Sequence, residues 1–124
     1  MRFLILLKCQ ESTETPPASL MEAIFKLGEE QTKTGTLLDT GGLAPNAQSA
    51  RVRLADGKIS VTDGPFTESK ELIASYAMFE LNSREEAVQA AKDFLQLHKD
   101  HWPGWEGESE IRQVFGPGDF PFPG

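Results

Sequence analysis

The sequence predicts an α+β fold with one antiparallel sheet and two helices. Short apolar runs of strand length alternate with two longer segments in which apolar residues recur at helical spacing. An Asp-Gly turn separates two alternating runs, which is typical of a β-hairpin. The chain has 124 residues, enough for one core. We therefore expect a single domain over residues 1–115, followed by a Pro/Gly-rich tail over residues 116–124.

The first part of the chain predicts a strand, a helix and a second strand. Residues 3–7 are all apolar and too few for a stable helix, which favours a strand covered on both faces. A helix is expected between Pro17 and Gly35, where an apolar stripe has helical spacing and the glycine provides a stop. Residues 36–42 then form a short strand that ends in two glycines.

The middle of the chain predicts a hairpin and a long strand. Residues 49–54 and 58–62 alternate between apolar and polar side chains, and Asp56-Gly57 between them is a preferred tight turn. In residues 72–81 both alternating faces are mostly apolar. A strand of this kind must be covered on each side.

The last part predicts a second helix and a final strand. Ser83 and Glu86 have the spacing of a capping box, so a helix is expected to begin there. Apolar residues between Ala87 and His98 share one helical face. After the break at Pro103-Gly104, residues 109–115 read as a strand.

This order of elements predicts how they assemble. Two split β-α-β units around one antiparallel sheet form a ferredoxin-like fold, with both helices on one face and the hairpin as an insertion. Two helices cover only one face of a sheet, whereas strands 3–7 and 72–81 are apolar on both faces. We therefore predict a homodimer in which a second copy covers the other face.

Charge and hydropathy exclude several classes of partner. The net charge is −7 and no run of consecutive basic residues is present, so we expect no direct binding to nucleic acid. The N-terminal apolar run is too short for a signal peptide or a membrane helix. A single cysteine, Cys9, fits a reducing compartment. We expect a cytoplasmic protein that does not enter membranes.

The segment Asp63-Gly64-Pro65-Phe66 is the most distinctive motif of the chain. A rigid loop that carries a carboxylate beside an aromatic ring could position a general base or bind a cation or a hydroxyl group. The alternative is a structural turn with solvated charges. The candidate ligand-binding residues are Asp63, Phe66, Glu68, Lys70 and Tyr76, and Asp63 is also the candidate catalytic residue.

The motif resembles the signature of the DGPF proteins, which are grouped with the YCII-related domains. Gly42-Leu43 and Pro45 ahead of the hairpin agree, and the similarity covers nearly all of residues 1–115. The resemblance implies a dimeric α+β barrel. YCII relatives carry a histidine and an aspartate proposed as a catalytic pair; Asp63 matches the aspartate, whereas the first helix here has no histidine.

Three functions are consistent with these observations. The first is a small-molecule-binding or enzymatic dimer with its pocket near the Asp63-Gly64-Pro65-Phe66 loop. The second is a non-enzymatic regulatory or interaction module linked to transcription, as relatives fused to sigma-factor-like regions imply. The third is a structural dimer whose motif serves folding.

We expect neither a metal nor a cofactor. His98 and His101 have a spacing that could hold a metal together with Asp100, but an apolar helix face and a helix end also explain them. The glycines match no phosphate-binding pattern.

Overall fold

The structure is a computed structural model that describes residues 1–124 except residues 11, 13, 67–71 and 120–124. Two of the candidate ligand-binding residues, Glu68 and Lys70, lie outside the described residues. The elements are β1 (Arg2–Cys9), α1 (Ala18–Lys33), β2 (Leu37–Gly42), the 3₁₀ turn η1 (Asn46–Gln48), β3 (Ala50–Ala55), β4 (Lys58–Asp63), β5 (Leu72–Glu80), α2 (Arg84–His101), β6 (Glu108–Val114) and the 3₁₀ turn η2 (Pro117–Asp119).

Four strands form one antiparallel sheet in the order β2-β5-β1-β6, with β1 between β5 and β6. This is the strand order of the ferredoxin-like fold, so the predicted fold class is confirmed. The hairpin β3-β4 forms a separate sheet of two strands. The Pro/Gly-rich tail contains η2, where the Gly116 amide donates to the Asp119 carboxylate at 2.6 Å.

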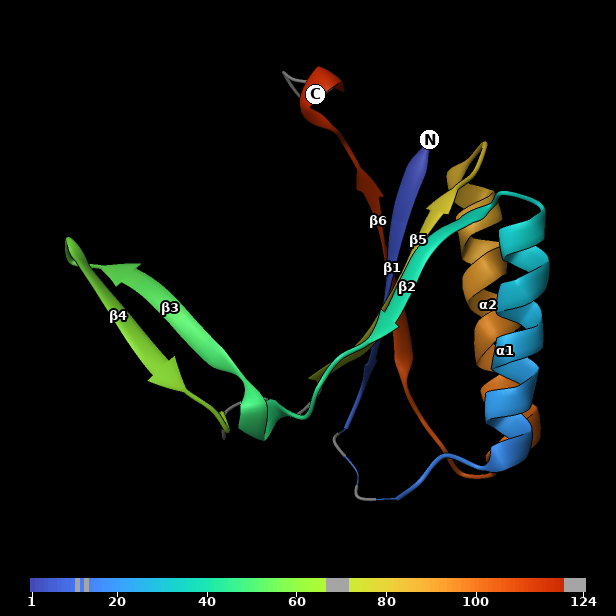
Figure 1. The fold of residues 1–124 in the computed structure, drawn as a ribbon, viewed down its shortest axis with the longest axis horizontal. Coiled ribbons are helices and arrows are strands. Elements are labelled where there is room, and N and C mark those ends of the chain that lie inside the picture. The colour runs from blue at the N-terminus through green and yellow to red at the C-terminus, as the bar shows by residue number, and fades with distance from the viewer. Residues whose placement is uncertain (11, 13, 67–71, 120–124) are drawn as a thin grey trace.

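Both helices lie on one face of the sheet (Figure 1). Helix α1 packs beside α2 and against β2, and α2 packs against β1 and β6. The core forms where these layers meet. Alternate residues of β1 point into it, because successive side chains of a strand lie on opposite faces. The buried apolar residues are Phe3, Ile5, Leu7, Leu20, Phe79, Ala87 and Ala91.

The other face of the sheet, which we call the helix-free face, carries neither of the two helices among the described residues (Figure 1). Leu4 and Leu6 of β1 alternate with the buried residues and therefore lie on this face. Their partners on β5 are Met78 and Tyr76. All four side chains are only half-buried in a single copy of the chain.

Lys8 and Glu110 frame the apolar centre of the helix-free face. Lys8 Nζ donates to Glu110 Oε1 at 3.0 Å, and the Arg112 guanidinium lies 3.6 Å from the other carboxylate oxygen. The hydrogen bond from Lys8, together with its charge, lowers the pKa of Glu110. The apolar centre therefore has a polar margin along β6.

The hairpin β3-β4, which we call the arm, extends away from the body on the side opposite the helices (Figure 1). All twelve of its strand residues are exposed. The turn at Asp56 and Gly57 has positive φ at both residues, as the tight turn predicted from this dipeptide requires. The hairpin is thus confirmed, and among the described elements its extensive contacts are those between its own two strands.

In the part of the chain that the structure describes, neither helix combines the length and the apolar composition needed to span a membrane.

Candidate functional site

A cavity of about 530 Å³ lies between the two helices and the sheet. Its apolar walls come from both layers, and small residues of α2 and of β5 are among those that line it. Phe25, which is 66% exposed, borders the cavity where it meets solvent. The apolar lining includes Ile5, Ile24, Leu37, Ala77, Ala90 and Phe94.

The floor of the cavity carries hydroxyl groups at one end. Leu7 of β1 pairs with Ser75 of β5 on one side and with Ser109 of β6 on the other. Directly paired residues of neighbouring strands project to the same face, so both hydroxyls lie on the helix side with Leu7. All three residues line the cavity. The mainly apolar floor of the cavity therefore carries hydroxyl groups at this end.

Ser109 is the lining residue with the clearest capacity for a ligand. Its Oγ atom is buried and, within the described residues, has no hydrogen-bond partner. A buried hydroxyl without a partner is costly, and such groups in proteins are usually satisfied by water or a bound molecule. Ser109 can both donate and accept a hydrogen bond at this end of the cavity.

Ionisable side chains border the cavity rather than form its floor. Glu29 and Lys33 lie near the end of α1. Tyr76 also contributes to the lining, but its pairing with Leu6 places its side chain on the helix-free face. Its hydroxyl donates to Asp39 at 3.1 Å, which raises the pKa of Tyr76. The floor residues Leu7, Ser75 and Ser109 carry no titratable group suited to acid–base chemistry.

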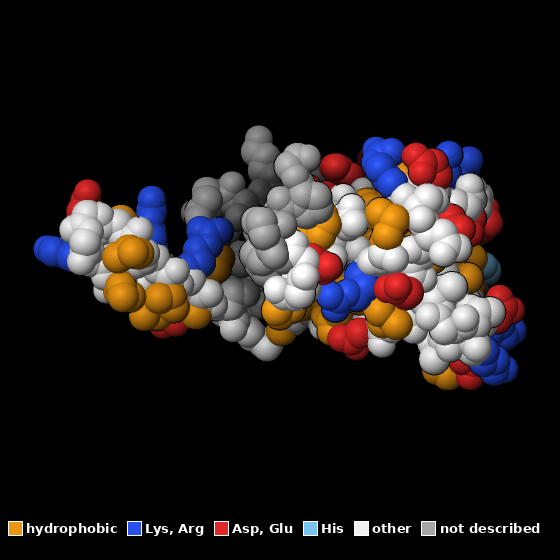
Figure 2. All heavy atoms as spheres, turned by 90° about the horizontal axis from the view of Figure 1, so that it is seen from above, with side chains coloured by type: hydrophobic (Ala, Val, Ile, Leu, Met, Phe, Trp, Pro, Cys, Tyr) orange, Lys and Arg blue, Asp and Glu red, His pale blue; other side chains and the backbone are white. Residues whose placement is uncertain are grey.

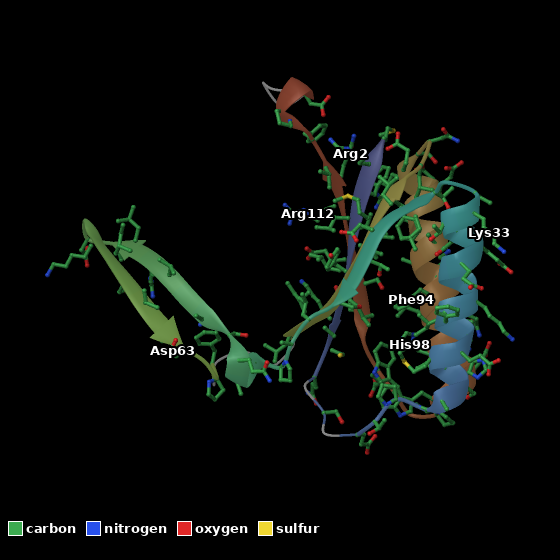
Figure 3. The ribbon with its side chains drawn as sticks, viewed as in Figure 1. Arg2, Lys33, Asp63, Phe94, His98 and Arg112 are labelled. Atoms are coloured by element: carbon green, nitrogen blue, oxygen red, sulfur yellow. The ribbon has the colours of Figure 1, made fainter. Side chains whose placement is uncertain are left out.

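The Asp63-Gly64-Pro65-Phe66 motif lies at the base of the arm. Figure 3 shows Asp63 there, across the sheet from Phe94 and His98. Asp63 is exposed at the end of β4, and the Phe66 ring lies under the Arg51 guanidinium, 3.7 Å from its centroid. Neither Asp63 nor Phe66 lines the cavity between the helices and the sheet.

The structure therefore brings the candidate site residues together only in part. Asp63 and Phe66 share the base of the arm, whereas Tyr76 lies in β5. Sequence reasoning missed Ser75 and Ser109 as site residues. The sequence pattern that could have identified them is a serine at an inward-facing position of a largely apolar strand, which occurs at Ser75 and at Ser109.

His98 is buried among aromatic rings of the helix layer. It is 5% exposed, its Nδ1 lies 3.0 Å from the Phe94 carbonyl oxygen, and its ring centroid lies 4.3 Å from that of Trp105. Burial lowers the pKa of His98, because a charged imidazole loses its hydration there. Among the described residues, no three His, Cys, Asp or Glu side chains are grouped so as to hold a metal ion.

Comparison with known proteins agrees with this architecture. The family model of the YCII-related domain matches residues 1–101, which include both helices, the four strands from β1 to β4 and the central strand β5. An uncharacterised protein of Rhizobium meliloti (strain 1021) is 26% identical over 104 residues, which cover 82% of this chain and 80% of that protein. Since the family model covers most of the chain, including the motif at the base of the arm, the chain belongs to the YCII-related domain family.

Proposed function

We propose that this YCII-related chain binds a small, mainly apolar molecule in the cavity between its helices and its sheet. The observation that carries the proposal is a volume of about 530 Å³ with apolar walls and hydroxyl groups at one end. Binding sites for small molecules are commonly apolar hollows of this size with a few polar groups that orient the ligand. A ligand with an apolar body and one polar end would match Ser75 and Ser109.

Binding without a reaction is the better supported function. A general acid or base must reach the reacting atoms, and Asp63 lies on the arm rather than at the cavity. The floor offers the neutral hydroxyls of Ser75 and Ser109, which orient a ligand but do not exchange protons readily near neutral pH.

The proposal is tested with the fluorescent dye anilinonaphthalene sulfonate, which has an apolar ring system and one polar group. Ala90 of α2 lines the cavity, so Ala90→Leu fills part of its volume. We expect the dye to bind at least about tenfold more weakly to this variant. Lys92→Leu is the matched control, because it adds the same leucine to the exposed side of α2.

A second comparison separates the cavity from the motif. Asp63→Asn removes the carboxylate at the base of the arm, and we expect dye affinity to stay at the wild-type value. Equal affinity for the wild type and Ala90→Leu would place the dye elsewhere and contradict the proposal. Loss of dye binding in Asp63→Asn alone would instead favour a pocket near the Asp63-Gly64-Pro65-Phe66 loop.

We also propose that the chain acts as a homodimer packed through the helix-free face. Support comes from a contiguous group of half-buried side chains on the face opposite α1 and α2, formed by Leu4, Leu6, Tyr76 and Met78. The alternative function, an interaction module of the kind implied by relatives fused to sigma-factor-like regions, is favoured by one observation, the exposed apolar side of the arm.

A further inference from the structure

The arm carries an apolar stripe that its own body leaves uncovered. Val52 pairs with Val61 and Leu54 pairs with Ile59, so these four side chains project to one side of the hairpin. Each of them is between 68% and 73% exposed. Figure 2 shows hydrophobic side chains gathered along one side of the arm. We call these four residues the arm stripe.

A stripe of this kind requires cover. A single two-stranded hairpin is marginally stable in water unless its apolar face packs on something. Its other side is polar, with Arg51 opposite Thr62 and Arg53 opposite Ser60. The alternation is that of a strand pair with one buried and one solvated face.

The base of the arm is held in place by the motif. The Gly64 amide donates to the Ser49 carbonyl oxygen at 2.6 Å, and Asn46 Nδ2 donates to the Phe66 carbonyl oxygen at 3.3 Å. A side chain at position 64 would collide with the Asn46 carbonyl oxygen, so glycine is required for this close approach. Arg51 of β3 packs on the Phe66 ring. These contacts join the segment before β3 to the segment after β4 and so close the base of the arm.

The direction in which the arm extends points to a second copy of the chain as the partner that covers the arm stripe. The arm extends on the side of the sheet opposite α1 and α2 (Figure 1). A copy that covers the helix-free face must therefore lie beside the arm. In a dimer with twofold symmetry each copy makes the same contacts with its partner. One arrangement of the two copies can therefore cover both arms and both helix-free faces.

Charge favours the same occupant. The arm holds three cationic residues, Arg51, Arg53 and Lys58, and two carboxylates, Asp56 and Asp63, for a net charge of plus one. The whole chain carries −7, so the body is more acidic than the chain as a whole. A basic arm is attracted to the acidic body of another copy, whereas an acidic segment would be repelled by it.

We propose that the arm docks its stripe on the body of a second copy, so that the two subunits of the dimer embrace each other through exchanged arms. The proposal rests on the homodimer proposed above. The Asp63-Gly64-Pro65-Phe66 motif acts in it as the clamp that closes the base of the arm. The surface involved is the arm stripe on one copy and the body beside the helix-free face on the other.

The first test introduces a charge into the stripe. Ile59→Asp places a carboxylate among apolar contacts, and we expect the dissociation constant of the dimer to rise about tenfold or more in analytical ultracentrifugation. Ser60→Asp is the matched control, because it adds the same charge to the next residue of β4 on the polar side of the arm. We expect its dissociation constant to stay within about twofold of the wild type.

The second test keeps the stripe apolar, in case Ile59→Asp fails to form the hairpin. A photoreactive benzoylphenylalanine replaces Leu54, with the same replacement at Arg53 as its control, in a mixture of isotope-labelled and unlabelled chains. We expect Leu54 to yield mixed-isotope crosslinks to body peptides, and Arg53 to yield far fewer.

The outcomes separate the two proposals. A wild-type chain that stays monomeric at micromolar concentration would overturn the homodimer and the exchanged arms together. A dimer in which Ile59→Asp dissociates no more than Ser60→Asp, and in which Leu54 crosslinks within its own chain or only to the other arm, would overturn the exchanged arms alone.

Discussion

His98 shows how a polar residue is accommodated in the helix layer. The Phe94 carbonyl oxygen partners its Nδ1, and the rings of Phe94 and Trp105 lie 4.8 and 4.3 Å from its own. Because Nδ1 lies within hydrogen-bond distance of a carbonyl, the neutral tautomer with hydrogen on Nδ1 fits this site. The surrounding rings offer a cation little hydration, so burial lowers the pKa.

This environment predicts a pH dependence of stability. Unfolded His98 takes up a proton near its ordinary pKa of 6.5, whereas folded His98 does so only at lower pH. Between these two values the unfolded state binds more protons, so acidification favours unfolding and stability is regained as the pH rises above the ordinary value. We expect the melting temperature to fall between about pH 7.5 and about pH 5.5 in the wild type, and to fall less in His98→Gln.

The comparison is made on the slope of melting temperature against pH, since His98→Gln also changes packing. His101→Gln removes the other histidine, at the last position of α2, and controls for the loss of an imidazole from the same helix. The same slope in His98→Gln and in the wild type would contradict the assignment of the pH dependence to His98.

At the scale of elements, α2 begins as its sequence predicts, with one difference. Ser83 Oγ accepts a hydrogen bond from the Glu86 amide at 3.2 Å, as expected for a capping box. The Glu86 carboxylate reaches the Asn82 amide at 2.8 Å, one residue before the expected partner. Two backbone amides at the helix N-terminus still have hydrogen-bond acceptors. The capping box therefore forms, with the Glu86 carboxylate bound to the amide of Asn82 instead of that of Ser83.

The cap predicts a defined loss of stability. Ser83→Ala leaves the Glu86 amide without its side-chain acceptor, and we expect a loss of about 1 kcal/mol in the free energy of unfolding. Urea titration measures this at one fixed protein concentration, because association would add to the apparent stability. Ser83→Asp supplies another capping oxygen and should keep most of the free energy of unfolding that Ser83→Ala loses. If Ser83→Asp is as destabilised as Ser83→Ala, the loss does not come from the missing cap.

Local patterns predicted the elements well, because helical spacing, alternation and an Asp-Gly turn depend on neighbouring residues. The position of the arm could not be predicted in this way. Residues 49–54 and 58–62 alternate as a half-buried hairpin does, and nothing local says whether the partner of the apolar side is the same chain. The cavity was missed for a related reason: Ala90 and Ala91 read as core positions, and the space beside them depends on what faces them across the layer.

At the scale of the whole molecule, the helix-free face and the arm lie on the same side of the sheet. The helix-free face holds Leu6 and Met78, and the arm extends from that side with its stripe exposed (Figure 1). The helices cover the other side and form one wall of the cavity. Association through the helix-free face would thus leave the cavity, between α1, α2 and the sheet, outside the interface.

The homodimer makes a prediction about two methionines. Met78 pairs with Leu4 at the centre of the helix-free face, whereas Met21 lies on α1 and is 51% exposed. Met78→Glu would bury a carboxylate between the two sheets, so we expect the dimer to weaken roughly 30-fold or more, the effect of about 2 kcal/mol at an interface centre. Met21→Glu makes the same chemical change away from that face and should leave association unchanged.

Light scattering coupled to size-exclusion chromatography distinguishes the species by mass. The wild type and Met21→Glu should elute with twice the 13.7 kDa mass of one chain at micromolar concentration, and Met78→Glu should shift toward the monomer mass. Far-ultraviolet circular dichroism checks that Met78→Glu keeps its helices, since both helices lie on the opposite face of the sheet. If Met78→Glu remains a dimer as tight as Met21→Glu, the helix-free face is not the interface, and the half-buried side chains of β1 and β5 must be covered by a different partner.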